Sequence, residues 1–346
     1  MIDLSKKIIE LIGATKSFVY KTTNTAMVFT YYSIGKMIIE ELQSGNNKAQ
    51  YGANLLATVS TDLKSQLGKG YSVDNLENMR KFYLAYHTQF QISEKGSRIL
   101  ENQLISENLS RKLPNQFLSW SHYLFLSRIT NTLERNFYEI EALQNNWKLK
   151  DLERQFDSGL FERLTLSKNK EEVLQLAKKG QTIQKPNDLF KEPFILEFLG
   201  LDEKANYSET DLETAIINEI EHFMLEMGKG FFFGGRQVRF TFEEDHYRID
   251  LVFYNRLLQC FVLIDLKIGK LKHQDLGQMQ MYVNYYDRFV KTQTENPTIG
   301  IVLCKDKNNA MVEITLPQNN NQIFASKYQT ILPSKTDLQE ILNHYD

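Results

Sequence analysis

The sequence lacks most of the features that mark secreted, membrane-spanning or polycationic proteins. Among its 346 residues only two are cysteines, Cys260 and Cys304, and both lie in apolar runs where a thiol behaves as a small hydrophobic side chain. A disulfide or a zinc site is therefore not expected. No uninterrupted apolar run is long enough to cross a bilayer, and the N-terminus has no basic, apolar leader. We therefore expect a cytoplasmic protein with no membrane partner.

The sequence also lacks a strong net charge. The formal charge is −2 at pH 7, so the whole molecule is not a polycation that would bind nucleic acid indiscriminately. Its halves differ, however: residues 1–150 carry 18 Lys and Arg against 13 Asp and Glu, a net of +5, whereas residues 201–346 carry 15 against 21, a net of −6. If the protein contacts nucleic acid, the first half is the better candidate for holding the phosphate backbone. Such a charge excess is also typical of a merely solvated surface.

Two periodicities divide the chain. Apolar positions recur at helical spacing before Lys179, whereas runs of period two appear only after Arg236. The segment KKGQTIQKPNDL at 178–189 has the glycine, proline and polar content of a linker. The sequence therefore predicts an α+β protein of two domains, with an all-helical domain over residues 1–184 and an α/β domain over residues 185–346. A closing helix is expected at 335–343, and the formation of a homo-oligomer stays open.

One part of the helical half has the outline of a helix-turn-helix unit. A helix that stops at the glycines of GKGY is followed by a second helix, for which Ser72 is a natural N-cap. In such a unit Asn75, Asn78 and Lys81 are the outward candidates for nucleic-acid contact. An ordinary helical hairpin has the same outline, and the sequence by itself favours that simpler interpretation. The domain is therefore expected to bind either nucleic acid or a protein partner.

The second half is organised around YRIDLVFYNRLLQCFVLIDLKIGK at 247–270. Period two places Asp250 in the first apolar run and puts Asp265 and Lys267 on one face of the second. If the two runs form an antiparallel hairpin, Asp250 and Asp265 come side by side with Lys267 one step beyond. Burying such charges is costly unless they pair or hold a metal. A buried Lys–Asp ion pair that ties two strands together is the alternative.

On these residues the chain resembles the PD-(D/E)XK nuclease superfamily, in which two acids and a lysine lie on the second and third strands of the domain. Three longer segments are similar to bacterial YhcG-like proteins: LEFLGL at 196–201, YNRLLQCFVLIDLKIGKLKHQDLGQMQMYVNYYD at 254–287 and NPTIGIVLCKD at 296–306. The resemblance covers nearly the whole chain. It implies a restriction-endonuclease-like domain, with a central mixed sheet flanked by helices, joined to an N-terminal helical domain.

The resemblance also implies additional site residues. A glutamate on the first helix of the family joins the two site carboxylates, and this role falls on Glu213, which lies within the apolar stripe of a helix expected over 212–227. A first-turn acid that complements the helix dipole is the alternative for Glu213. Gln278 and Tyr282 lie one turn apart and resemble a Gln-x-x-x-Tyr element whose glutamine sits beside the metal. A buried amide that ties helix to sheet is the alternative for Gln278.

The expected function is that of a metal-dependent endonuclease that hydrolyses phosphodiester bonds in nucleic acid, with DNA favoured. Asp250 and Asp265, aided by Glu213 and the backbone carbonyl of Leu266, would hold one or two Mg²⁺ ions, with Mn²⁺ as the substitute. Lys267 would lower the pKa of the metal-bound water or orient it, and Gln278 would position that water or a phosphate. The alternative is a catalytically silent protein that binds nucleic acid or protein on a nuclease fold.

Overall fold

The fold is that of a computed structural model, which describes residues 2–44, 49–90, 117–165, 168–201 and 207–334. The closing helix expected at 335–343 lies outside these residues. The chain forms two compact units, Met1–Glu153 and Arg154–Asp346. No helix of the described residues is long and apolar enough to cross a membrane. Cys260 and Cys304 are buried free thiols, as the apolar runs around them predict.

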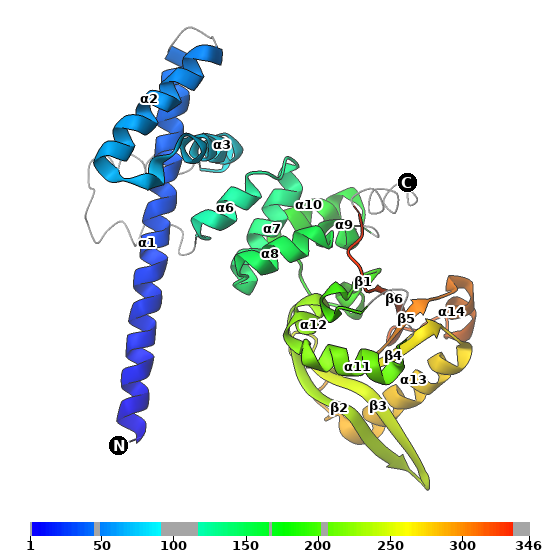
Figure 1. Ribbon diagram of the computed structural model, residues 1–346. Coiled ribbons are helices and arrows are strands. Elements are labelled where there is room, and N and C mark those ends of the chain that lie inside the picture. The colour runs from blue at the N-terminus through cyan, green and yellow to red at the C-terminus, as the bar shows by residue number, and fades with distance from the viewer. Residues whose placement is uncertain (1, 45–48, 91–116, 166–167, 202–206, 335–346) are drawn as a thin grey trace. The chain divides into compact units, whose positions relative to one another are not determined.

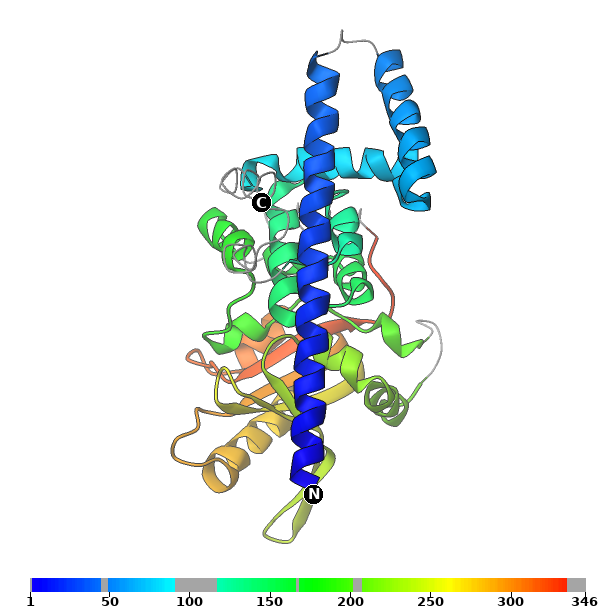
Figure 2. The same ribbon diagram turned by 90° about the vertical axis from the view of Figure 1, so that its left-hand side faces the viewer.

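The first unit is all-helical in its described residues, which confirms the class expected from its apolar periodicity (Figures 1 and 2). Its elements are α1 (Ile2–Ser44), α2 (Ala49–Leu67), the 3₁₀ turn η1 (Lys69–Tyr71), α3 (Val73–Phe90), α6 (Trp120–Leu126), α7 (Thr132–Asn145) and the start of α8 (Leu149–Asp157). The helix α3 packs across α1 close to Gly35, where a Cβ atom would overlap the Met79 carbonyl. Glycine at this position therefore allows the two helices to approach closely.

The turn between α2 and α3 has the expected cap. The Ser72 hydroxyl accepts a hydrogen bond from the Asn75 backbone N–H at 3.2 Å. The side chain of Asn75 donates to the Gly70 carbonyl at 2.5 Å, so it stabilises the turn. Asn78 is half-buried, whereas Lys81 is exposed on α3. The outline of two helices and a turn is present, and nucleic-acid contact by Asn75, Asn78 and Lys81 stays a prediction.

The second unit contains a six-stranded mixed sheet in the order β1-β6-β5-β4-β3-β2. The strands are β1 (Phe194–Ile195), β2 (Phe231–Phe242), β3 (Asp245–Asn255), β4 (Cys260–Lys270), β5 (Ile299–Asp306) and β6 (Ile323–Gln329). The pairs β2–β3 and β3–β4 are antiparallel, whereas β4–β5, β5–β6 and β1–β6 are parallel. This topology confirms the central mixed sheet predicted for the second half.

Helices cover both faces of this sheet, which explains why the strands are apolar on both faces. Along β4, Val262 and Ile264 pack in the core formed with α11 (Glu209–Asn218) and α12 (Ile220–Met227). The alternate residue Leu263 packs in the core formed with α13 (His273–Tyr285). The shorter elements of the unit are α14 (Asn309–Thr315), the π-helical turn η5 (Tyr286–Val290) and the 3₁₀ turns η3 (Pro186–Leu189) and η4 (Glu197–Leu199).

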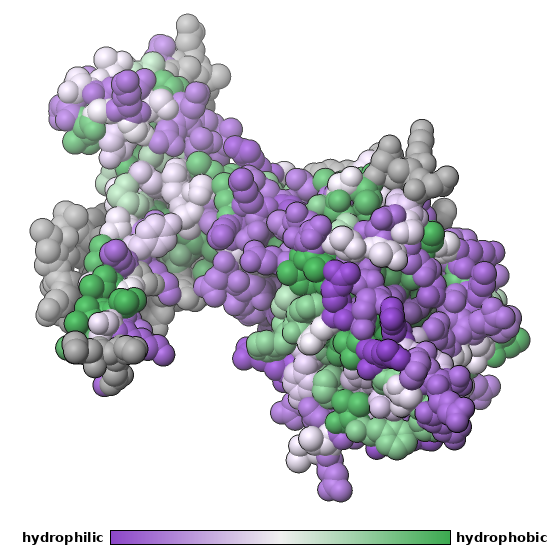
Figure 3. Space-filling view, turned by 60° about the horizontal axis from the view of Figure 1, so that its bottom comes forward, coloured by the Kyte–Doolittle hydropathy of each residue, from purple (hydrophilic) through white to green (hydrophobic). Residues whose placement is uncertain are grey.

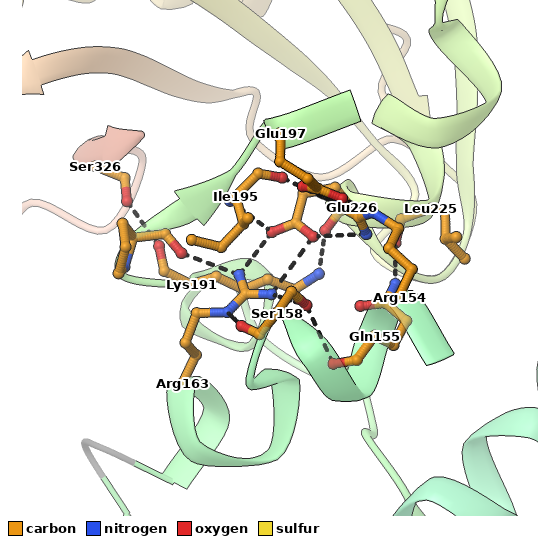
Figure 4. A network of polar contacts seen from close by, with 11 residues as sticks. Arg154, Gln155, Ser158, Arg163, Lys191, Ile195, Glu197, Leu225, Glu226 and Ser326 are labelled. Carbon is orange, nitrogen blue, oxygen red and sulfur yellow. Dashed lines mark hydrogen bonds and ion pairs between the residues drawn. The ribbon is translucent and has the colours of Figure 1, made fainter. Parts of the chain in front are cut away.

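The division into units falls after Glu153, whereas the sequence placed the domain boundary after residue 184. The end of α8, α9 (Leu160–Thr165) and α10 (Lys170–Lys179) belong to the second unit. A buried network of polar contacts accounts for the difference (Figure 4). Its centre is Glu226, whose Oε1 lies 2.6 Å from Nη1 of Arg163 and whose Oε2 lies 3.2 Å from Nη1 of Arg154. These ion pairs fix α8 and α9 to α12.

Candidate active site

The sheet forks at the two aspartates of the central stretch. The ladder between β3 and β4 runs from Asn255↔Cys260 to Leu251↔Ile264 and stops there. Beyond this rung, towards the start of β3 and the end of β4, β3 pairs with β2 alone and β4 pairs with β5 alone. The β2–β3 hairpin consequently leaves the body of the sheet, as Figure 1 shows. Asp250 and Asp265 are the next residues after the last rung, so the register places them opposite each other at the fork.

Asp250 connects the strands at the point where backbone pairing ends. Its Oδ2 accepts a hydrogen bond from the Leu266 backbone N–H at 2.8 Å. Its Oδ1 accepts another from Nε2 of Gln237 on β2 at 3.0 Å. Because the carboxylate receives hydrogen bonds from both neighbouring strands, its position relative to β4 is fixed by the fold.

Asp265 and Lys267 form a close ion pair on β4. Nζ of Lys267 lies 2.7 Å from Oδ2 of Asp265 and 3.8 Å from Oε2 of Glu209 on α11. Burial raises the pKa of Asp265 to about 6, because the lowering effect of Lys267 does not offset burial and the nearby charge of Asp250. Burial by itself would lower the pKa of Lys267, but the Asp265, Glu209 and Asp250 carboxylates raise it above its ordinary value. The amine therefore stays charged.

Glu213 reaches the same site from α11. The helix begins at Ser208, whose Oγ accepts the Asp211 backbone N–H at 3.1 Å. Glu213 is only 3% exposed, and its Oε2 accepts a hydrogen bond from Nε2 of Gln237 at 2.5 Å. Its Oε1 lies 3.0 Å from Nε of Arg236. Gln237 therefore donates to both Glu213 and Asp250, so one amide links the helix to the fork.

Gln237 is the site residue that sequence reasoning missed. Its φ of 48° is in the left-handed region, which is uncommon for a residue other than glycine. The β2–β3 register shifts between Phe233 and Gly235, just before it. The glycine pair in FFFGGRQVRF was the only sequence signal of an irregular strand, because a glutamine on an edge strand is otherwise an ordinary polar residue.

Gln278 and Tyr282 form a chain of hydrogen bonds from α13 to β3. Nε2 of Gln278 donates to the Tyr282 hydroxyl at 2.5 Å, and this hydroxyl donates to the Arg248 carbonyl at 2.9 Å. Tyr282 is buried, whereas Gln278 is exposed. Burial raises the pKa of Tyr282 to about 12, with the charge of Asp265 as the next cause. The pair thus ties α13 to the strand two residues before Asp250.

The side chains at the fork are of the kind that bind a hard divalent cation, although they do not form a complete coordination site. Within the described ranges, no group of three or more His, Cys, Asp and Glu side chains is arranged to hold a metal. Two buried carboxylate oxygens at the site, Oδ2 of Asp265 and Oε1 of Glu213, contact the cations Lys267 and Arg236 at 2.7 and 3.0 Å, and no other partner is found for them among the described residues. Few carboxylates and several waters are the preferred ligands of Mg²⁺, so these residues fit such an ion.

A mixed sheet covered by helices, with acids at a strand fork and the run Asp265-Leu266-Lys267, defines a PD-(D/E)XK nuclease domain. Residues 187–343 match the family described as "YhcG PDDEXK nuclease domain", and residues 7–163 match the "DUF1016 N-terminal domain". The chain is 37% identical over 350 residues to the protein of Escherichia coli (strain K12) described as "Putative nuclease YhcG", covering 97% of this chain and 92% of that protein. The chain belongs to the YhcG family.

Solved structures give weaker similarities. A repair endonuclease from Pyrococcus abyssi aligns over 38% of this chain and 50% of its own, with 14% identity and a TM-score of 0.26. A structure titled "Structure of EndoMS-dsDNA2 complex" aligns over 39% of this chain and 51% of its own, with 12% identity and a TM-score of 0.26. Scores this low carry no argument about the activity of this chain.

Proposed function

We propose that the protein is a divalent-metal-dependent endonuclease that hydrolyses phosphodiester bonds in nucleic acid, with DNA as the favoured substrate. The observation that carries the proposal is the convergence of Asp250, Asp265 and Lys267 at the fork of the sheet. Asp265 is 3% exposed, and burying two carboxylates together is costly in the absence of a cation. A protein that kept only the fold would not need these three groups together.

The carboxylates of Asp250, Asp265 and Glu213 and the carbonyl of Leu266 are the proposed ligands of Mg²⁺, or of Mn²⁺ in its place. A bound divalent ion supplies charge neutralisation at phosphoryl oxygens and lowers the pKa of a coordinated water. Gln237 holds Asp250 and Glu213 at hydrogen-bonding distances of 3.0 and 2.5 Å, so it positions two of these ligands. Such supporting contacts tune both the affinity and the geometry of a metal site.

Lys267 is the proposed cationic group at the reacting phosphate. Asp265 holds its ammonium at 2.7 Å, while the side chain remains 17% exposed. The amine therefore has access to solvent and stays protonated, and it donates hydrogen bonds to a phosphoryl oxygen or to the attacking water. Tyr282 holds the backbone of β3 at Arg248, and Gln278 holds Tyr282, so this pair supports the strand that carries Asp250.

The proposal is tested by incubating the purified full-length chain with labelled duplex DNA, single-stranded DNA and RNA, with Mg²⁺ and with EDTA. Cleavage is expected only with the metal, and Asp250→Asn and Asp265→Asn are expected to abolish it while preserving the fold. Glu221→Gln, which changes an exposed acid of α12, is the matched control and should cleave like the wild type. A folded wild type that cleaves none of these substrates with Mg²⁺ or Mn²⁺ would favour the silent binding protein.

A further inference from the structure

The β2–β3 hairpin beyond the fork is a two-stranded arm with two different faces. The strands stay in register to the turn, with Arg239↔Arg248, Phe240↔Tyr247 and Thr241↔His246 as successive pairs. Because β4 no longer pairs with β3 here, both edges of the arm are free of further strands within the described residues. Side chains alternate along each strand, so directly opposed residues share a face. Figure 1 shows the arm projecting from the sheet.

One face of the arm is aromatic and packed. The ring of Phe240 stacks on Tyr247 of the opposite strand with the ring centroids 5.3 Å apart, and on Tyr285 of α13 at 4.1 Å. Phe240 also meets Tyr282 edge to face at 5.7 Å. These contacts fix the arm against α13, because aromatic pairs of this geometry contribute beyond the area that they bury. The arm is therefore held in place even though only two strands form it.

The other face of the arm is basic and continues the active site. It carries Arg239 and Arg248 directly opposite each other. Two residues nearer the fork lie Gln237 and Asp250, which are joined by the hydrogen bond from Nε2 of Gln237 to Oδ1 of Asp250 at 3.0 Å. Both arginines are exposed, and among the residues that the structure describes neither forms an ion pair. Like charges directly opposite on a sheet destabilise it, so this pair has a cost that the fold does not offset. An anionic ligand would offset it.

We infer that the Arg239–Arg248 pair binds phosphate groups of the nucleic-acid backbone next to the phosphate that is cleaved, an inference that rests on the proposed function. Two residues along a strand span roughly 7 Å, so the pair lies about that far from the carboxylate of the fork. Guanidinium groups match phosphate oxygens with two parallel hydrogen bonds. The hydrogen bond from Tyr282 to the Arg248 carbonyl at 2.9 Å fixes the backbone of one of the two.

The turn of the arm limits the contact to this pair. Glu243, Glu244 and Asp245 follow at the tip, and all three are exposed acids. The nucleic-acid backbone is therefore expected to contact the arm near the fork and not at its acidic turn. Figure 3, which brings this side of the second unit forward, shows strongly hydrophilic side chains gathered beside apolar patches. Arg239 and Arg248 therefore form a local positive patch in a half of the chain whose net charge is −6.

The test measures binding without cleavage. The full-length chain is titrated against a fluorescein-labelled DNA duplex and against labelled RNA in EDTA, over a series of NaCl concentrations, by fluorescence anisotropy. The variants are the double change Arg239→Ala with Arg248→Ala, the charge-preserving pair Arg239→Lys with Arg248→Lys, and Arg256→Ala as the control. Arg256 is an exposed arginine of the β3–β4 turn, at the other end of β3.

The double alanine variant is expected to lose about two phosphate contacts on one of the two probes. The slope of log Kobs against log salt is then shallower than that of the wild type by roughly 1.8. If the two proteins bind equally at 1 M salt, the variant binds on the order of sixty-fold more weakly than the wild type at 0.1 M salt. The lysine pair should retain most of the slope, and Arg256→Ala should leave it unchanged. Circular dichroism should show the fold unaltered, because both arginines are exposed.

The results separate this inference from the proposed function. If the wild type cleaves nucleic acid but the double alanine variant keeps the wild-type slope, the inference is overturned and the nuclease assignment stands. If Arg256→Ala lowered the salt slope and the affinity by as much as the double alanine variant, the inference would be overturned as well. The loss would then reflect the overall charge of the protein and not the position of the two arginines. Absence of any binding by the wild type to either probe also overturns it. Arm-dependent binding without cleavage in Mg²⁺ would support phosphate binding by the Arg239–Arg248 pair and contradict the proposed nuclease activity.

Discussion

The stability of the second unit should depend on the single buried carboxylate of Glu226. This side chain is 0% exposed, and its oxygens meet Nη1 of Arg163 at 2.6 Å, Nη1 of Arg154 at 3.2 Å and the Ile195 backbone N–H at 3.1 Å (Figure 4). Lys191 donates to the Glu226 backbone carbonyl from the same side. Replacement by alanine would leave the fully buried Arg163 without its carboxylate.

The loss of unfolding free energy in Glu226→Ala follows from the buried ion pair and from the lowered pKa of Glu226. Breaking a buried ion pair by removing one partner costs about 3–5 kcal/mol, because the other charge stays buried and uncompensated. Burial alone would raise the pKa of Glu226, but Arg163, Lys191 and Arg154 outweigh it and lower the pKa from 4.5 to about 2. A fall of that size corresponds to roughly 3 kcal/mol of stability at neutral pH. We therefore expect Glu226→Ala to lower the free energy of unfolding by about 3 kcal/mol.

The sign of the pH dependence follows from the lowered pKa. The folded state keeps Glu226 ionised down to about pH 2, whereas the unfolded chain protonates near its ordinary pKa of 4.5. The contribution of ionised Glu226 to the free energy of unfolding is complete above pH 4.5 and is lost as the pH falls towards 2. The difference in unfolding free energy between the wild type and Glu226→Gln should therefore shrink below pH 4.5.

The assay can separate the two units within one molecule. Both tryptophans, Trp120 and Trp147, lie in the first unit, so their fluorescence during a urea titration reports that unit. Hydrogen exchange of peptides from β4 and β5 reports the second. Glu226→Ala should destabilise only the second. The control Glu219→Gln, which removes an exposed pair with His222, should cost under about 1 kcal/mol. A loss below 1 kcal/mol in Glu226→Ala would refute the reasoning.

Three other outcomes follow from the contacts. Lys267→Ala should spare much of the metal affinity but lower the cleavage rate by about two or more orders of magnitude, measured in single turnovers with Mg²⁺. Gln237→Ala should weaken Mg²⁺ binding by about ten-fold or more in calorimetry, because two ligands lose their common donor; unchanged affinity would remove Gln237 from the site. A fragment of residues 149–346 should unfold cooperatively, whereas residues 185–346, which lack both arginines of the network, should show weak or no cooperative unfolding by circular dichroism.

Much of the fold and the centre of the site could be predicted from local patterns. Strands buried on both faces are continuous apolar runs, so Asp250 and Asp265 appeared as exceptions, and the short turn between the runs set them opposite each other. The network of Glu226 could not be predicted in this way. Its partners are 63 and 72 residues distant, and in sequence all of these residues resemble an ordinary solvated helix face. The boundary after residue 184 stays a prediction; the segment that carries Arg154 and Arg163 precedes it, while their contacts are with Glu226 of α12.

The basic face of the arm depends on register in a way that sequence alone did not reveal. The turn is Glu243-Glu244, without the glycine that usually marks a two-residue hairpin turn, and Glu243 adopts a φ of 56°. A slip of one residue in either strand would move its arginine to the face that packs on α13. Such a slip would also separate Tyr247 from Phe240, which stacks on both Tyr247 and Tyr285 of α13. The aromatic face therefore selects the register, and this register aligns Arg239 and Arg248 with Gln237 and Asp250.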